Sequence, residues 1–312
     1  MHSKNIVIGV LLLVLITVVG YLLLNSKNTV VTENTPIAEV TPNEPESEVG
    51  DNTEPLPEVI EETRGEETVL GITVNGNDVT AYHFGTGQTE LLFIGGIHGG
   101  YSWNTSLLAY ELIDYLDANP NLVPSDITIT VIPVANPDGL EATVGTVGRF
   151  KSEVTTAITE AERIAGRFNA NKVDLNRNFD CEWEATGVWQ SKEVSGGTSP
   201  FSEPEAAAIK NYIEKYKPAA AVVWFSAEGK VYPSACEGAP SNASIELAAT
   251  YAKGAEYPTE AEFNAYTITG DMVNWLAKNK IPAISVLLTN HKDTEWDKNL
   301  AGVEAVINAY AE

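Results

Sequence analysis

The side chains best suited to chemistry lie in two short segments. His98 stands in GGIHGG, where the glycines allow a tight backbone turn after an apolar run. The second segment, GRFNANKVDLNRNF, holds Arg167, Asp174, Asn176 and Arg177. Imidazole can bind a metal or carry a proton, and a planar guanidinium can bind a carboxylate through two hydrogen bonds. What these groups do together depends on the elements that position them.

Those elements alternate between β-rich runs and helical patterns from Val69 onward. Ser202 and Glu205 have the spacing of a capping box at the start of one helix. The expected strands are 69–75, 78–84, 90–96, 219–226, 282–288 and a strand within 126–137 that runs into a loop, and the expected helices are 105–120, 201–218, 244–254, 271–279 and 296–311.

The alternation predicts an α/β fold: a single domain whose mixed, mostly parallel twisted sheet is covered by helices on both faces. We find no internal repeat, so we assign residues 68–312 to one domain. In such sheets the working site lies at the carboxyl ends of the strands. His98 follows one of the expected strands, which favours a site at that edge.

The N-terminal part of the sequence is expected to anchor the chain in a membrane. Within residues 1–25, the apolar run 6–24 has about the length of a bilayer-spanning helix, and no small-x-small cleavage site follows it. A cleaved signal peptide is the alternative. Residues 26–67 are acidic and rich in Pro, Thr and Glu, which predicts a disordered linker. We therefore expect a single-pass protein whose domain lies on the extracytoplasmic side.

The formal net charge of the chain is −24. Binding of a phosphate backbone needs clustered Lys and Arg side chains. The composition therefore argues against nucleic acid as a partner.

Four segments together resemble the zinc carboxypeptidase family, in particular its short bacterial members. They are GGIHGGYSWNT (95–105), NPDG (136–139), GRFNANKVDLNRNFD (166–180) and TSPFSEPEA (198–206). The resemblance implies a metallocarboxypeptidase, a hydrolase that removes C-terminal residues from peptides. In that family a His, a Glu and a second His bind zinc and leave one position for water, and another Glu acts as general base.

The resemblance assigns a role to each of the five candidate side chains in these segments. His98 matches the first zinc ligand, and Asp174 matches the residue that hydrogen-bonds this imidazole from behind. Arg167 matches the arginine that polarises the scissile carbonyl. Asn176 and Arg177 match the pair that binds the terminal carboxylate of the substrate. The implied partner is a peptide, or a cell-wall stem peptide, with a free C-terminal carboxylate.

Three positions that carry the family's chemistry hold residues without that chemistry. Ser102 stands where the glutamate ligand is expected, directly before Trp103. Phe225 stands in place of the second histidine ligand, and Leu287 in place of the general-base glutamate. Tyr101 offers no carboxylate that could replace the missing ligand. The residues around these positions still fit the family pattern.

A single neutral imidazole cannot hold catalytic zinc, so we expect zinc to bind weakly or not at all. Whether the chain is an enzyme therefore stays open. We expect a catalytically impaired family member, a pseudoenzyme, that keeps a carboxylate-binding pocket. One alternative is an active zinc carboxypeptidase or cell-wall peptide amidase that recruits Glu228 or His291. Another alternative is a stalked surface scaffold with a vestigial pocket.

The resemblance also bears on three residues outside the motifs. It places Cys181 and Cys236 at the same rim of the sheet, where a disulfide is expected in an oxidising compartment. Two unpaired thiols are the alternative. Tyr266 lies one residue away from the position of a substrate-contacting tyrosine of the family.

Overall fold

The computed structural model describes residues 65–311. The expected membrane anchor (1–25) and nearly all of the expected linker (26–67) lie outside the described residues. Within residues 65–311, no helix combines the length and the apolar character needed to cross a membrane.

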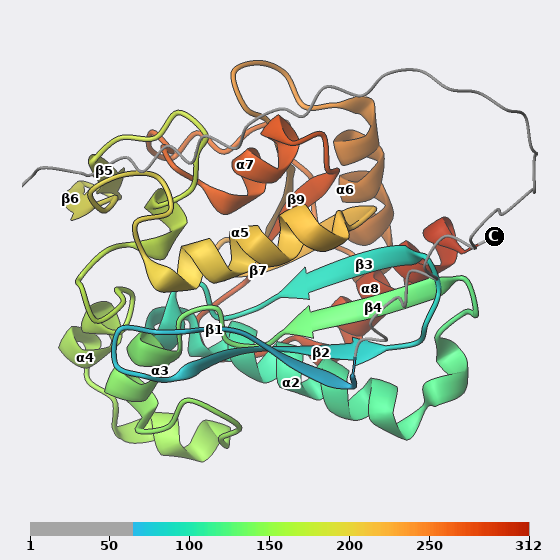
Figure 1. Cartoon of the computed structure of the whole chain (residues 1–312), viewed down its shortest axis with the longest axis horizontal. Coiled ribbons are helices and arrows are strands. Elements are labelled where there is room, and N and C mark those ends of the chain that lie inside the picture. Colours follow the sequence, from blue (N-terminus) through green and yellow to red (C-terminus); the bar gives the residue numbers. More distant parts are fainter. Residues whose placement is uncertain (1–64, 312) are drawn as a thin grey trace, which may run out of the picture. The chain divides into compact units, whose positions relative to one another are not determined.

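A seven-stranded sheet forms the centre of the domain (Figure 1). Its strands stand in the order β1-β2-β4-β3-β7-β9-β8. β4, β3, β7 and β9 are parallel neighbours, whereas β1, β2 and β8 pair antiparallel at the two sides. The predicted mixed sheet with a parallel centre is confirmed. The bounds are β1 (Glu67–Ile72), β2 (Asp78–Phe84), β3 (Thr89–Ile94), β4 (Ile127–Ile132), β7 (Ala220–Ser226), β8 (Lys230–Pro233) and β9 (Ala283–Leu288).

Helices cover both faces of this sheet, as predicted (Figure 1). α2 (Trp103–Ala118), α6 (Asn242–Ala255) and α8 (Trp296–Tyr310) bury their apolar sides against one face. α5 (Pro204–Tyr216) and α7 (Met272–Lys278) cover the other face. The central strands are therefore buried on both sides, which explains their nearly continuous apolar sequence.

The expected capping box at the start of α5 is wrong. α5 begins at Pro204, its N-cap is Glu203, and no side chain of the described residues caps it. Proline fits the first helical position because its missing N–H has no acceptor there in any case. The Ser202 hydroxyl instead donates to Glu203 Oε1 at 2.9 Å, and Glu205 is buried within the first turn.

Several short elements were not expected from the sequence. The NPDG segment begins a helix, because Asn136 Oδ1 accepts from the Gly139 N–H at 2.9 Å and caps it. A small hairpin lies apart from the main sheet and will matter for the site. Short 3-10 helices aside, the additional elements are β8 of the main sheet, α3 (Pro137–Val144), α4 (Glu160–Ala165) and the hairpin β5 (Thr186–Trp189) and β6 (Lys192–Ser195).

The parallel strands bring distant residues to one edge of the sheet. His98 follows β3, Ser226 ends β7, and His291 follows β9. In the register of β7 and β9, Phe225 lies directly opposite Leu287. Side chains alternate between faces along a strand, and Phe225 shares the α5 and α7 face with Val223.

Candidate functional site

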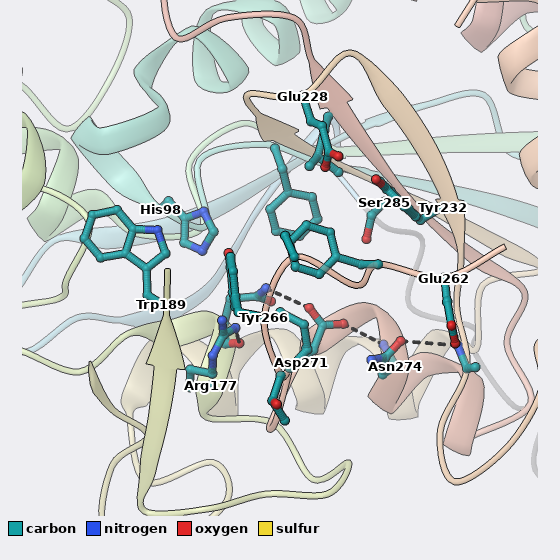
Figure 2. Close-up of a pocket in the computed structure, with 18 of the residues that line it drawn as sticks. His98, Arg177, Trp189, Glu228, Tyr232, Glu262, Tyr266, Asp271, Asn274 and Ser285 are labelled. Atoms are coloured by element: carbon teal, nitrogen blue, oxygen red, sulfur yellow. Dashed lines mark hydrogen bonds between the residues drawn. The ribbon is translucent and has the colours of Figure 1, made fainter. Parts of the chain in front are cut away.

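A cavity of about 940 Å³ opens at the carboxyl ends of β3, β7 and β9. Its lining includes His98, Arg167, Asn176 and Arg177, so the structure brings together all but one of the retained family positions. Figure 2 shows His98, Trp189 and Arg177 on one side of this cavity and Ser285, Tyr232 and Glu262 on the other. Asp174 lies behind the lining and is completely buried.

The imidazole of His98 lies in the wall of the cavity and is largely buried. Both ring nitrogens are shielded from solvent, and neither has a hydrogen-bond partner among the described residues. Nε2 lies 3.6 Å from Asp174 Oδ1, and the Phe225 ring centroid lies 5.5 Å from that of His98. Burial and the neighbouring Arg167 guanidinium hold the pKa of His98 well below its usual value. His98 is therefore neutral at physiological pH.

Arg167 and Asp174 form a buried ion pair. Arg167 Nε donates to Asp174 Oδ2 at 2.9 Å, and Nη2 lies 2.8 Å from the same oxygen. Burial opposes charge on Asp174, but the Arg167 and Arg177 guanidinium groups outweigh it and lower the pKa of this carboxyl. The Arg167 guanidinium also stacks 4.6 Å from the Trp189 ring centroid. Both charges are thus compensated within the protein.

Arg177 is fixed mainly by backbone carbonyl groups. Its Nε and Nη2 donate to the Val188 carbonyl at 3.3 and 2.9 Å, and its Nη1 donates to the Asn176 carbonyl at 2.6 Å. A guanidinium has five N–H groups, so N–H groups remain beyond these three bonds, and the Tyr266 side chain also interacts with the Arg177 guanidinium. Among residues 65–311 no carboxylate forms an ion pair with this buried guanidinium, although Asp174 and Asp271 interact with it electrostatically. Arg177 is therefore the strongest candidate anion site of the cavity.

Asn176 is tied to the start of α7. Its Nδ2 donates to Asp271 Oδ2 at 2.7 Å, and its Oδ1 accepts from the Met272 N–H at 3.2 Å. Burial raises the pKa of Asp271, although its hydrogen bonds and Arg177 favour the charged form. These contacts fix the orientation of the Asn176 amide and leave it one N–H for a ligand.

The three substituted positions differ in their surroundings. Phe225 and Leu287 line the cavity and face each other across adjacent strands. Ser102 is buried in the turn before α2, does not line the cavity, and its hydroxyl has no hydrogen-bond partner in residues 65–311. Tyr101 lines the cavity instead, with its ring centroid 4.5 Å from that of His291.

The residues present do not fit the zinc site that the fold family implies. Among residues 65–311, no three His, Cys, Asp or Glu side chains come together as a potential metal-binding group. The one matching imidazole has shielded nitrogens beside a phenyl ring. A catalytic zinc site needs three protein ligands and an open position, and this donor set offers neither.

The two residues considered as replacement ligands have other partners. His291 Nδ1 lies 2.9 Å from the Ser226 hydroxyl, which donates to Asn104 Oδ1 at 3.2 Å. Burial and the nearby Arg163 lower the pKa of His291 to about 4. Glu228 forms an ion pair with Lys230 at 3.3 Å. Both His291 and Glu228 line the cavity, but neither lies with two further donors of the described chain.

Sequence reasoning missed the role of the β5–β6 hairpin. Val188 supplies the carbonyl that holds Arg177, and Trp189 supplies the ring over Arg167. The only sequence signal is the alternation in TGVW, which is too short to be read as a strand. Tyr266 lines the cavity, and the Arg177 guanidinium carbon lies 5.9 Å from its ring centroid.

The predicted disulfide is confirmed. Cys181 and Cys236 are bonded, with their Cα atoms 5.9 Å apart. The bond joins the segment after Arg177 to the loop after β8, which carries the cavity residue Ala235. It therefore holds two sides of the cavity together.

The sheet, its helices and the buried arginine groups define a protein of the carboxypeptidase type. Residues 63–296 match the sequence model of the family described as zinc carboxypeptidase. The chain belongs to this family, as its motifs indicated. A region of 136 residues is 30% identical to mouse (Mus musculus) carboxypeptidase D and covers 42% of the chain and 8% of that protein. The chain spans only 8% to 16% of the length of the first curated relatives it matches.

Solved structures share the fold at low sequence identity. Carboxypeptidase A from Helicoverpa armigera aligns with a TM-score of 0.62 and 17% identity, covering 79% of this chain and 69% of that one. The murein-tripeptide amidase from Escherichia coli O157 aligns with a TM-score of 0.55 and 19% identity, covering 79% and 92%. These likenesses concern the fold alone.

Proposed function

We propose that this chain is a membrane-tethered, extracytoplasmic member of the family that binds peptide C-termini without hydrolysing them. The observation that carries the proposal is the contrast inside one cavity: Arg177 has N–H groups beyond the three that bind backbone carbonyls, while a phenyl ring, that of Phe225, lies beside the remaining imidazole. The cavity therefore offers an anchor for a carboxylate and no set of metal donors that could activate water.

The chemistry of the pocket residues explains the loss of hydrolysis. Leu287 accepts no proton, and a general base contributes roughly 10²–10⁴-fold to the rate in typical enzymes. Phe225 brings no lone pair to a metal ion. Zinc therefore binds weakly or not at all. Arg167 serves to position the bound peptide rather than to polarise a scissile carbonyl.

The class of ligand follows from the guanidinium of Arg177 and from the peptide substrates of the family. A peptide, or a stem peptide of the cell wall, offers the terminal carboxylate that a guanidinium binds through paired hydrogen bonds. The similarity in fold to a murein-tripeptide amidase and to a carboxypeptidase supports peptide ligands of either origin. The N-terminal apolar run and acidic linker support placement of the domain outside the membrane.

The test compares peptide ends on the full-length chain in detergent. Two tripeptides that differ only in a free C-terminal carboxylate or a carboxamide are titrated by calorimetry. We expect the carboxylate form to bind roughly 10- to 100-fold more tightly, as charge-assisted hydrogen bonds contribute about 1.5–3 kcal/mol. Arg177→Gln should abolish the difference, whereas Arg149→Gln, which removes an ion pair with Asp114 outside the cavity, should preserve it.

Two outcomes would contradict the proposal. Equal binding of both peptides, or an unchanged preference in Arg177→Gln, would favour the scaffold with a vestigial pocket. Chelator-sensitive cleavage of the carboxylate peptide would favour an active carboxypeptidase or amidase. The observation that favours an active carboxypeptidase or amidase is that His291 and Glu228 both line the cavity.

A further inference from the structure

A second cavity, of about 520 Å³, lies at the opposite edge of the sheet from the cavity that holds Arg177. Its lining residues Ala219 and Pro282 directly precede β7 and β9, so they mark the edge where these parallel strands begin. The last turns of α5 and α7 form its side walls. The two cavities share no lining residue.

The lining of the second cavity is largely apolar. Its apolar members are Ile213, Pro218, Ala219, Trp275, Ile281 and Pro282. Covering such a surface with hydrocarbon removes it from water, which is favourable in free energy. The recess therefore suits a ligand with an apolar part.

Two lysines lie at the helix ends that form the walls. Lys217 is the C-cap of α5, and Lys280 follows the end of α7; both side chains line the cavity, and both residues are exposed. Neither forms an ion pair with another residue of 65–311. The acidic lining residue Glu214 is paired with Lys210 instead, at 2.8 Å. The second cavity thus combines an apolar floor with two ammonium groups that are available to an anion.

The chain enters the domain at this same edge of the sheet. β1 is antiparallel to β2, and β2 is antiparallel to β4, so β1 begins at the edge where β4 and its parallel neighbours begin. Gly65, the first described residue, lies just before β1. The apolar run that is expected to anchor the chain comes earlier in the sequence. The sequence that leads to the expected anchor therefore joins the domain at the edge of the second cavity.

We propose that the second cavity binds an anionic phospholipid of the membrane to which the chain is tethered. The lipid phosphate accepts hydrogen bonds from the Lys217 and Lys280 ammonium groups, and lipid hydrocarbon covers Pro218, Ile281 and Pro282. Lysines close to an anionic lipid surface are attracted to it over about one Debye length. The inference rests on the membrane tether of the proposed function.

The distribution of charge favours this one orientation on a lipid surface. The chain carries a net charge of −24, so an anionic membrane repels the molecule as a whole. Exposed carboxylates of Glu182 and Glu262 line the Arg177 cavity at the opposite edge. Glu66 and Glu67 lie at the lysine edge, but beside β1 at the far side of the sheet from β7 and β9. With the second cavity on the membrane, the Arg177 cavity opens away from the lipid.

The experiment measures how fast single lysines of the full-length chain are acetylated by an activated ester in lipid nanodiscs. The discs contain phosphatidylglycerol mixed with phosphatidylcholine, or phosphatidylcholine alone, and mass spectrometry gives the rate at each lysine. We expect Lys217 and Lys280 to react roughly 5-fold more slowly in the anionic discs, because phosphate binds their amino groups. Salt at about 0.5 M should remove this protection by screening.

Lys172 provides a matched control. It is exposed and has a left-handed backbone, with φ of 62°, as Lys217 and Lys280 do with φ of 49° and 63°. It lies outside the second cavity and should react at the same rate in both kinds of disc. Lys217→Gln should abolish the protection of Lys280, because one ammonium group holds the phosphate less well than two. Lys172→Gln should preserve that protection.

The outcomes separate the lipid site from the proposed function. Equal rates at Lys217 and Lys280 in both kinds of disc overturn the lipid site. Equal protection in both kinds of disc also overturns it, because an occupant other than anionic lipid, such as an acidic polypeptide, then covers the lysines. A chain that does not enter the discs contradicts the membrane tether, and the same rates with added phosphatidylglycerol vesicles then decide the lipid site. The carboxylate preference of the Arg177 cavity is measured by peptide titration and does not depend on any of these results.

Discussion

At the residue scale, Phe225 and Leu287 stand where the family resemblance predicts a metal ligand and a general base. A His and a Glu side by side without a metal would bury polar groups with unmet hydrogen bonds, which costs free energy. Phe225 and Leu287 instead face each other across neighbouring strands as an apolar pair. The cavity is therefore stable without an ion, while Arg167 and Asp174 keep their charges matched.

This pairing predicts the effect of restoring one chemical group alone. Phe225→His should lower the free energy of unfolding by roughly 1–3 kcal/mol, because it places a polar ring among apolar neighbours and loses packing. Phe225→Leu serves as the control and should cost less, since it stays apolar. Urea denaturation measures both. Equal or higher stability of Phe225→His, especially with added zinc, would contradict the account at this position.

At the element scale, the start of α5 shows how local signals compete. Pro204 sets the first turn and the expected Ser202 cap is not used. Glu205 is then buried, with Oε2 accepting from Asn169 at 3.2 Å and Oε1 without a partner in residues 65–311. Burial raises the pKa of Glu205 to about 7. This carboxyl therefore keeps its proton in the folded state at mildly acidic pH.

The raised pKa predicts a pH-dependent stability. Between about pH 4.5 and 7 the folded chain binds a proton at Glu205 that the unfolded chain has lost, so stability falls as pH rises across this window. The loss amounts to at most roughly 3 kcal/mol, at about 1.4 kcal/mol per pKa unit. Glu205→Gln should remove it. Thermal unfolding of both proteins at several pH values checks this, and parallel pH profiles would refute it.

The elements of the fold differ in how far the sequence predicted them. The central strands were predictable from their continuous apolar runs, and the helices after them from their helical periodicity. His98, Arg167, Asn176 and Arg177 were predicted to meet, and they do. The hairpin at 186–195 was not, since each strand has four residues and its role is carried by one backbone carbonyl.

Other features depend on side-chain contacts that no sequence pattern encodes. The orientation of the Asn274 amide follows from the Ala235 N–H, which lies far away in sequence. The proximity of the His98 and Phe225 rings likewise brings together two residues that are distant in the chain. Whether Ser102 occupies the position of the lost glutamate ligand stays a prediction.

At the scale of the whole molecule, the disulfide between Cys181 and Cys236 links two segments 55 residues apart. Because one segment follows the Arg177 turn and the other carries Ala235, the bond affects stability and the cavity together. The same oxidised bond agrees with the extracytoplasmic placement that we propose.

Removing the disulfide should have two measurable effects. Closing a loop of this length stabilises a chain by roughly 4 kcal/mol in the chain-entropy model, and typical losses are about 2–5 kcal/mol. The Cys181→Ser, Cys236→Ser double variant should unfold at lower denaturant and should distinguish a peptide with a free C-terminal carboxylate from its carboxamide form less well. Unchanged stability would show that the bond does not form in the native protein.

The central claim is that this family member lacks the donors for a catalytic metal. The most direct measurement is the zinc content of the full-length chain after incubation with zinc and dialysis, beside the Ser102→Glu, Phe225→His, Leu287→Glu variant. We expect far less than one zinc per unmodified chain and a value near one in the variant. One tightly held zinc per unmodified chain, lost on His98→Ala, would contradict the account.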